Sequence, residues 1–335
     1  MYVSWKNAVL GAALMAGALA SQAAPRFIAG PYKHTAMHRQ PSHVITIAPQ
    51  GVPVPAVAVG KSAFGPGTMS WAFATGECGQ ERWGKQSGQE IADANVALFD
   101  NAGVDYIVST GGQGGIFTCA TDDGMERFIS RYDSKHLVGI DFDIEAGQTH
   151  AQVDSLVQRI KAAQVRRPHL RYSFTIATFA ASDGSHKSLN REGEAILKAV
   201  RRNGLREYTL NLMVMNYGPG SPAVCVLHRA RECDMGKSAI QAARNVHAKY
   251  GIAYDQIELT AMIGGNDVVT NVFTLADARL LAARVKKMGL AGLHYWSLDR
   301  DQPCKKKITR ASPSCSGVAV KALEFNRLLS EPHLH

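Results

Sequence analysis

The stretch GIDFDIE at positions 139–145 places three carboxylates at alternating positions of an apolar segment. Asp141, Asp143 and Glu145 alternate with isoleucine and phenylalanine, a pattern typical of a buried strand. Because successive side chains of a strand point to opposite faces, all three acids lie on one face, about 6–7 Å apart along the backbone. An edge strand with its acids in water is the alternative, and the apolar neighbours argue against it.

Three neighbouring carboxylates that are shielded from water cannot all be charged at low cost. At least one must be protonated or tightly hydrogen-bonded, and the crowding of like charges raises its pKa. A carboxyl group with a raised pKa is what a glycosidase needs as its general acid. The stretch therefore indicates acid–base chemistry on a glycosidic bond, if this face points into a closed interior.

The rest of the chain supplies elements that could enclose these acids. Apolar runs typical of strands alternate with amphipathic runs typical of helices. Strands are expected at 27–34, 68–75, 104–112, 137–145, 170–178, 208–218, 257–267 and 291–301. Helices are expected at 91–103, 124–135, 150–164, 190–204, 237–251, 274–289 and 317–330. This alternation indicates a parallel sheet, and eight units fit a single-domain (β/α)8 TIM barrel of the α/β class.

The first unit of this barrel is irregular. Residues 45–60 contain three prolines and are expected to be extended chain where a first helix would stand. An open, doubly wound sheet is the competing architecture, although no GxGxxG fingerprint follows an early strand. In a barrel, the three acids come at the C-terminal end of their strand, where the active sites of such barrels lie.

The N-terminus is typical of a secretory signal peptide. Lys6 precedes an apolar run from Ala8 to Ala20, and Ser21-Gln22-Ala23 is a small-residue cleavage pattern. The run is shorter than the roughly 20 residues that span a bilayer, so cleavage is favoured over a membrane anchor. We expect a signal peptide at 1–24 and a catalytic barrel at 25–335, in an extracellular or periplasmic protein without membrane contact after cleavage.

The formal net charge of +9 suits attraction to acidic surfaces such as cell walls. The basic runs VRR (165–167), RR (201–202) and KKK (305–307) are short and scattered. They favour solvated helix faces and loops over a nucleic-acid footprint. We therefore expect no nucleic-acid partner.

Six cysteines in the expected mature chain indicate disulfides, because the count is even and the chain is expected to be exported. Six cysteines allow 15 pairings. Cys225–Cys233 and Cys304–Cys315 would each close a short loop, which leaves Cys78–Cys119. Free buried thiols are the alternative, and the absence of a CxxC pair in the sequence disfavours a zinc site.

Several motifs together resemble glycoside hydrolase family 18, the chitinases and endo-β-N-acetylglucosaminidases. GIDFDIE resembles its DxxDxDxE signature, STGG (109–112) its SxGG motif, MNYG (215–218) its M-x-Y motif, and YWSLDRD (295–301) its segment with the sugar-stacking tryptophan. These motifs fall on the third, fourth, sixth and eighth expected strands. Together with MIGGND (262–267), they look closest to the archaeal and bacterial branch that includes the Pyrococcus chitinase catalytic domains.

The resemblance implies a role for each matching residue. Glu145 would protonate the glycosidic oxygen and later activate water, while the substrate's own N-acetyl oxygen attacks the anomeric carbon. Asp143 would orient the acetamide, and Asp141 would share a proton with Asp143. Tyr217 would donate a hydrogen bond to the acetamide oxygen, and Trp296 would form the floor under the sugar. For these two aromatic residues, plain core packing is the alternative.

Four further residues are candidates for substrate contact: Met215, Asn266, Asp267 and Tyr32. For Asn266 and Asp267, a helix-capping turn is the alternative. Two positions depart from the family pattern. Val138 stands where the signature begins with Asp, and Gly218 stands where many members have Asp after the tyrosine.

These observations predict a secreted glycoside hydrolase, a chitinase that cuts β-1,4 bonds after N-acetylglucosamine in chitin or chito-oligosaccharides. We expect a retaining, acetamide-assisted mechanism, no metal or organic cofactor, and a monomer. N-glycans or peptidoglycan as substrate remain alternatives, as does a lectin-like protein without turnover, although the presence of Glu145 argues against the last.

Overall fold

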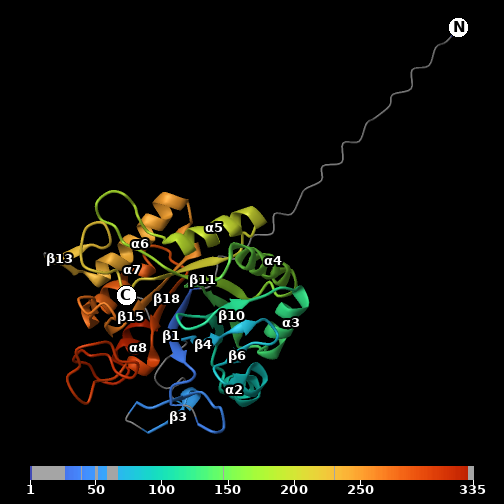
Figure 1. Ribbon diagram of the computed structural model, residues 1–335, viewed down its shortest axis with the longest axis horizontal. Helices are drawn as coiled ribbons and strands as arrows, with labels where there is room; N and C mark the ends of the chain where they lie inside the picture. Colours follow the sequence, from blue (N-terminus) through green and yellow to red (C-terminus); the bar gives the residue numbers. More distant parts are fainter. Residues whose placement is uncertain are drawn as a thin grey trace.

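The computed structural model describes Met1 and residues 27–38, 40–49, 52–58, 67–145, 147–229 and 231–330. Within them, eight parallel strands form a closed barrel (Figure 1). In order around the barrel these are β1 (Ile28–His34), β18 (Gly292–Trp296), β15 (Ile257–Met262), β12 (Thr209–Met213), β11 (Arg171–Ala177), β10 (Leu137–Asp143), β8 (Tyr106–Gly111) and β4 (Met69–Ala74). Each strand falls within an expected one, so the predicted (β/α)8 barrel is confirmed.

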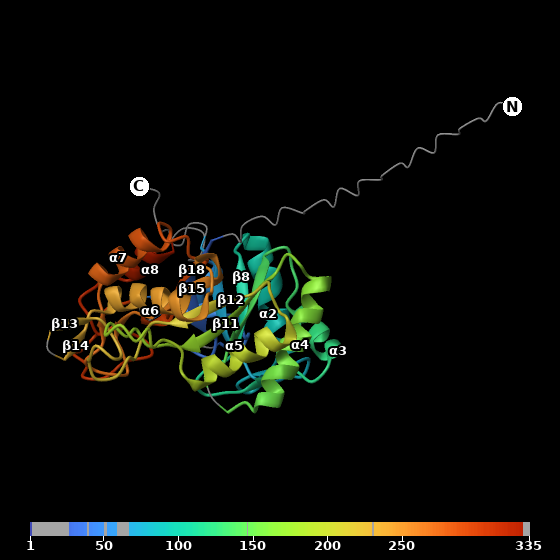
Figure 2. The same cartoon turned by 90° about the horizontal axis from the view of Figure 1, so that it is seen from above.

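The helices lie on the outside of the barrel, and Figure 2 shows α4 and α5 as neighbours. They are α2 (Gly88–Ala102), α3 (Asp122–Arg131), α4 (His150–Arg166), α5 (Arg191–Asn203), α6 (Met235–Tyr250), α7 (Leu275–Val285) and α8 (Glu324–Leu329). Ser87, Thr149 and Thr274 begin their helices with reciprocal capping boxes. Local sequence therefore sets where these helices begin.

Short strands and single helical turns lie in the connections between the barrel strands and helices. The short strands are β2 (Thr46–Ile47), β3 (Val54–Pro55), β5 (Gly76–Glu77), β6 (Arg82–Trp83), β7 (Gln86–Ser87), β9 (Phe117–Thr118), β13 (Leu227–Arg229), β14 (Glu232–Cys233), β16 (Gly264–Gly265) and β17 (Val272–Phe273). The 3-10 turns are η1 (Tyr254–Gln256) and η2 (Leu298–Arg300). In the irregular first unit, β2 and β3 pair as a small antiparallel hairpin.

The last helix is shorter than predicted. The carboxylate of Asp301 accepts the backbone N–H groups of Phe325 and Asn326 at 3.1 and 2.7 Å, which sets the start of α8 there. Leu323, directly before the helix, has φ of 59°, which an uninterrupted right-handed helix cannot contain. The prediction of helix over 317–323 is therefore wrong.

Three strands end five residues earlier than predicted, at Met213, Met262 and Trp296. After the first two, the backbone takes left-handed conformations at Asn216 and Gly264, with φ of 51° and 72°. A strand cannot continue through such residues. The residues that follow these strands, which include several predicted site residues, therefore lie in loops at the C-terminal end of the barrel.

Strand β10 divides its side chains between two environments. Ile140 and Phe142 are fully buried in the apolar core, and Phe142 contacts Phe117 and Phe174. The alternating acids point the other way, into the barrel, where Asp141 is also buried. The strand periodicity thus separates an apolar outer layer from a polar interior.

The three predicted disulfides are confirmed. They join Cys78 to Cys119, Cys225 to Cys233 and Cys304 to Cys315. Each of these cysteines lies in a segment that follows a barrel strand. All three disulfides therefore brace the loops at the C-terminal end of the barrel.

The expected signal peptide lies outside the described residues, apart from Met1. Within the described part of the chain, no helix has both the length and the apolar character needed to cross a bilayer.

Candidate active site

The register of β10 with its neighbours places hydroxyl groups beside the first acid. Asp141 is level with Ser109 of β8 and with Ser173 of β11. One step further along the strand, Asp143 is level with Gly111 and Thr175. A side chain at Gly111 would place its Cβ 2.1 Å from the carbonyl oxygen of Asp143, so glycine is required there.

Asp141 accepts four hydrogen bonds from hydroxyl groups in the barrel interior. Its Oδ2 accepts from Tyr32 at 2.9 Å and from Ser109 at 2.6 Å. Its Oδ1 accepts from Ser173 at 2.6 Å and from Thr175 at 2.7 Å. Donors on both oxygens favour the ionised form of this buried acid.

Asn211 of β12 extends this network to the next strands. Its amide nitrogen donates to the hydroxyl groups of Tyr32 and Thr175, each at 2.8 Å. Its amide oxygen accepts from Thr260 of β15 at 2.8 Å. The orientation of Asp141 is therefore fixed by side chains from five strands.

The electrostatics of the acids follow from burial and crowding. Burial raises the pKa of Asp141, against the effect of its hydroxyl donors. Burial, together with the charges of Glu145 and Asp141, raises the pKa of Asp143 well above its ordinary value. Burial and the charge of Asp267 raise the pKa of Glu145. Burial therefore favours the protonated form of all three acids, and hydrogen-bond donors oppose this effect at Asp141.

Asp143 and Glu145 line an open pocket of about 300 Å³ at the C-terminal end of the barrel. The pocket wall is mostly apolar, with aromatic and methionine side chains. Its lining residues are Tyr32, Phe73, Gln113, Asp143, Glu145, Thr175, Ala177, Thr178, Phe179, Asn190, Met213, Met215, Asn216, Thr260, Met262, Asp267 and Trp296. Such a pocket can take an uncharged ligand with apolar faces.

Aromatic rings surround Trp296 in this pocket. Phe73 stacks on it with a centroid distance of 5.5 Å and an interplanar angle of 15°. His34 meets it edge-on at 6.0 Å, and Tyr32 lies 6.4 Å away at a tilt. The strand register explains this group, because Trp296 is level with Tyr32 on one side and with Met262 on the other.

The structure brings together six of the nine predicted site residues as pocket lining: Tyr32, Asp143, Glu145, Met215, Asp267 and Trp296. Asp141 lies behind them and holds the hydroxyl network. Asn266 is buried, and its amide nitrogen donates to the carbonyl oxygens of Met262 and Gly264. It therefore stabilises the loop after β15, and a contact between Asn266 and substrate stays a prediction.

Tyr217 is not among the lining residues. It is buried, and its hydroxyl group has no hydrogen-bond partner among the described residues. The neighbouring Asn216 lines the pocket instead, and its side chain donates to Asp267 at 2.9 Å. The contact between Tyr217 and substrate stays a prediction.

Sequence reasoning missed several residues of this site, namely Ser173, Thr175, Asn211, Phe73 and Asn216. For most of these residues, the sequence carried a signal that could have identified them. Polar side chains at alternating positions of a predicted barrel strand point into the barrel together with the acids. Asn216 carried no such signal, because its role depends on a loop conformation.

The described residues offer one grouping that is close enough to hold a metal ion, Glu77 with Cys78 and Cys119. Those two cysteines form a disulfide, so neither supplies a thiolate. The expectation that the protein uses no metal stays a prediction.

Comparison with known proteins identifies relatives of this barrel. The chain is 27% identical over 237 residues to a probable bifunctional chitinase/lysozyme of Escherichia coli, a match that covers 66% of this chain and 26% of that protein. It is 27% identical over 233 residues to endochitinase 11 of Metarhizium anisopliae, with coverage of 65% and 44%. The chain is similar to chitinases. It spans less than half the length of these two curated relatives, and no protein-family model matches it.

Solved chitinase structures share the fold. The catalytic domain of a hyperthermophilic chitinase from Pyrococcus furiosus superimposes with a TM-score of 0.68 and 24% identity, over 91% of this chain and 94% of that one. Catalytic-site mutants of active domain 2 of the Pyrococcus enzyme, complexed with chito-oligosaccharides, match with a TM-score of 0.68 and 23% identity, over 91% and 93%. The predicted resemblance to chitinases of the Pyrococcus type is confirmed.

Proposed function

We propose that the protein is a chitinase that hydrolyses β-1,4 bonds following N-acetylglucosamine, with retention of the anomeric configuration. One observation carries the proposal. Glu145 and Asp143, both with raised pKa values, line a pocket together with Trp296. The pocket thus combines a proton donor with an apolar wall on which a sugar ring can stack. The sequence similarity to chitinases supports the same substrate class.

In the proposed first step, Glu145 gives its proton to the glycosidic oxygen as the bond from that oxygen to C1 breaks. The acetamide oxygen of the same sugar forms the new bond to C1 from the opposite face, which gives a cyclic oxazolinium-like intermediate. The carboxyl group of Asp143 orients the acetamide by contact with the N–H group of the acetamide. Asp141 places negative charge beneath Asp143 and the acetamide. Stabilisation of this positive charge in a site with little water lowers the barrier.

In the second step, ionised Glu145 takes a proton from a water molecule. The oxygen of that water bonds to C1 while the acetamide oxygen leaves, so the acetamide is restored. Two inversions at C1 give net retention, and Glu145 is again protonated. Trp296, supported by Phe73, holds the sugar over the acids in both steps.

We also propose that the chain is exported, with residues 1–24 removed, and that it acts as a monomer. The signal-like N-terminus and the three disulfides support export. N-terminal sequencing of the secreted protein should begin at or near Pro25, and analytical ultracentrifugation should give the mass of one chain.

The decisive experiment compares the mature protein with its Glu145→Gln variant on chitohexaose, a high-mannose glycopeptide and peptidoglycan. Mass spectrometry would identify the products. We expect the parent protein to shorten chitohexaose and the Glu145→Gln variant to leave it intact, because the glutamine amide cannot donate the required proton. The variant should still bind the sugar, since the shape of the pocket and the stacking surface remain.

The outcomes separate the alternatives. Cleavage of the glycopeptide or of peptidoglycan alone would keep the acid assignment and change the substrate. Equal activity of the Glu145→Gln variant would refute the acid assignment, and a first product of inverted configuration would refute the acetamide mechanism. Sugar binding without any cleavage would identify a lectin-like protein.

A further inference from the structure

The loop between Cys304 and Cys315 carries a dense cluster of positive charge. We call residues 304–315 the basic loop. Lys305, Lys306, Lys307 and Arg310 are all exposed, and no acidic residue occurs between positions 302 and 316. Four cations without an intervening acid on one short loop create a strong local positive potential.

The charge of the basic loop is not neutralised by the neighbouring chain. Across the described residues, none of its four cations forms an ion pair with a carboxylate. Other surface cations differ, since Arg167 pairs with Glu126 and Asp133, and Arg202 pairs with Asp154. The cations of the basic loop are therefore available to an external anion.

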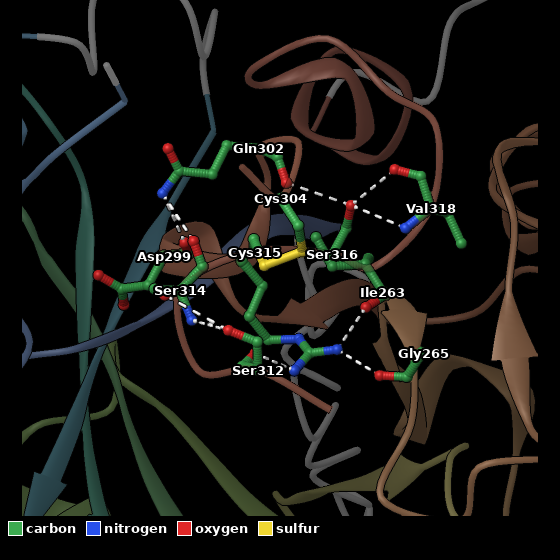
Figure 3. Close-up of a disulfide and its surroundings, with 11 residues drawn as sticks. Ile263, Gly265, Asp299, Gln302, Cys304, Ser312, Ser314, Cys315, Ser316 and Val318 are labelled. Atoms are coloured by element: carbon green, nitrogen blue, oxygen red, sulfur yellow. Dashed lines mark hydrogen bonds between the residues drawn. A yellow bond between two sulfur atoms is a disulfide. The ribbon is translucent and has the colours of Figure 1, made fainter. Parts of the chain in front are cut away.

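The base of the basic loop is tightly built (Figure 3). Besides the disulfide, the side chain of Gln302 donates to the carbonyl oxygen of Ser314 at 2.8 Å. The backbone N–H of Ser316 donates to the carbonyl oxygen of Gln302 at 3.0 Å. The two ends of the loop are thus joined by a covalent bond and by hydrogen bonds, which reduces the entropy that the loop loses on binding a ligand.

A buried arginine ties this base to the neighbouring loop. Arg300 is 1% exposed, and its guanidinium donates to the carbonyl oxygens of Ile263, Gly265 and Ser312. Ser316 packs so closely that a Cβ on Gly264 would lie 1.9 Å from its carbonyl oxygen. The basic loop and the loop after β15 therefore form one rigid unit.

This unit connects the base of the basic loop to two segments that carry lining residues of the pocket. On one side, Gly265 donates to Ser316 and is followed two residues later by Asp267, a lining residue. On the other side, the chain runs from the lining residue Trp296 through η2 into the loop. The base of the basic loop is therefore joined to two segments that lead into the pocket.

We propose that the basic loop binds carboxylate groups on an amino-sugar polymer whose uncharged sugars occupy the pocket. The different polarity of the two regions supports this division, because the pocket wall is mostly apolar whereas the basic loop carries four exposed cations that attract anions. The inference deepens the proposed function and rests on it, since it names the substrate as an acidic derivative of the same backbone. Peptidoglycan, whose peptides carry carboxylates, has this chemistry.

The test uses two soluble polymers with one backbone, carboxymethyl chitin, which is anionic, and glycol chitin, which is neutral. Binding is measured by biolayer interferometry at low and at high salt. All proteins carry Glu145→Gln so that turnover does not interfere. The test variant adds Lys305→Gln, Lys306→Gln and Lys307→Gln.

A matched control adds Arg279→Gln, Arg284→Gln and Lys287→Gln instead. These exposed cations lie on α7 and directly after it, away from the loops that follow the strands. Both variants lose three positive charges, so they change the net charge equally. A difference between them reports the position of the charge.

We expect the test variant to bind carboxymethyl chitin about tenfold more weakly than its parent at low salt, because three exposed charge pairs are lost. Added salt should reduce this difference by screening. The affinity of the test variant for glycol chitin should stay within about twofold of the parent's, because this polymer carries no charge for the loop to bind. The affinities of the control for both polymers should also stay within about twofold of the parent's, because its exposed cations lie away from the basic loop.

Four results would overturn the inference: an unchanged affinity of the test variant for carboxymethyl chitin, an equal loss in the control, an equal loss on glycol chitin, or a parent that binds neither polymer. Cleavage of chitohexaose by the protein with intact Glu145 keeps these results separate from the proposed function. If chitohexaose is cleaved, the basic-loop inference alone fails. If chitohexaose is not cleaved either, the proposed function fails with it.

Discussion

Hydroxyl groups from three strands surround Asp141 inside the barrel and favour its ionised form. Tyr32, Ser109, Ser173 and Thr175 donate to its two oxygens. A buried carboxylate without such donors would be costly, and it would take up a proton. The hydroxyl donors therefore oppose the protonation of Asp141, whereas burial and the neighbouring acids favour the protonated form of Asp143.

Ser173→Ala removes one donor to Asp141 without touching the pocket. We expect kcat to fall roughly tenfold, which corresponds to about 1.4 kcal/mol of transition-state stabilisation, while KM stays nearly unchanged. The free energy of unfolding should fall by about 1–3 kcal/mol because a buried acceptor loses its partner. Steady-state kinetics and urea unfolding measure both.

Ser238→Ala is the control for this substitution. Ser238 is buried in α6, and its hydroxyl accepts a hydrogen bond from the backbone of Val226 at 3.0 Å. Loss of the Ser238 hydroxyl group should lower the free energy of unfolding without changing kcat. An equal fall in kcat for both variants would show that reduced stability, and not the charge on Asp141, limits the reaction.

Asp267→Asn tests the electrostatic coupling between Asp267 and Glu145. Burial and the charge of Asp267 raise the pKa of Glu145. Removing that charge lowers the pKa of Glu145, so the acid loses its proton at a lower pH. The alkaline limb of the kcat profile should therefore move toward lower pH, as pH-dependent kinetics on chitohexaose would reveal.

Asp183→Asn removes the same charge from an exposed position in the loop after β11 and should leave the pH profile in place. If the Asp267→Asn profile coincides with that of the parent, Asp267 contributes nothing to the pKa of Glu145.

The strands of the barrel carry a second charged cluster that stabilises the fold. Glu258 of β15 accepts from Arg171 of β11 at 3.0 Å and pairs with His294 of β18 at 2.8 Å. Burial alone raises the pKa of Glu258, but Arg171 and His294 outweigh it and lower the pKa to about 2. This group links three strands of the barrel.

Glu258→Gln should lower the free energy of unfolding at neutral pH by about 3–5 kcal/mol, because Arg171 then lacks its buried carboxylate partner. The pKa of Glu258 is lower in the folded than in the unfolded chain. Its contribution is therefore fully present above the ordinary pKa of 4.5 and is lost as the pH falls toward about 2. Urea unfolding between pH 2 and pH 7 would show a weaker acid dependence in the variant. A parallel pair of curves would contradict the assignment.

At the scale of the whole molecule, the three disulfides differ in the length of chain that they close. Cys78–Cys119 spans 41 residues, whereas Cys225–Cys233 spans 8. Replacing the first pair by serine should cost about 4 kcal/mol of stability, and replacing the second about 2.5 kcal/mol, because longer loops gain more entropy when they are opened. Thermal unfolding of the two double variants would test this order. The reverse order would show that native contacts outweigh loop length.

The sequence by itself determined the barrel and the chemical character of the site. Strand and helix periodicity, helix caps and short cysteine spacings are local properties, so they can be recognised without knowing which strands are neighbours. The alternation in GIDFDIE was enough to place Asp141, Asp143 and Glu145 on one inward face. The same local signals failed at 317–323. The start of α8 is set by the side chain of Asp301, which is not part of that segment.

Only the tertiary structure decided which residues complete the site. The closing of the barrel sets the register that brings Tyr32, Ser109 and Ser173 to Asp141. The backbone is left-handed at Asn216, and Asn216 lines the pocket whereas Tyr217 does not. Such contacts join positions that are distant in sequence, and their geometry depends on closure of the whole sheet. Residue types and spacing alone therefore could not reveal them.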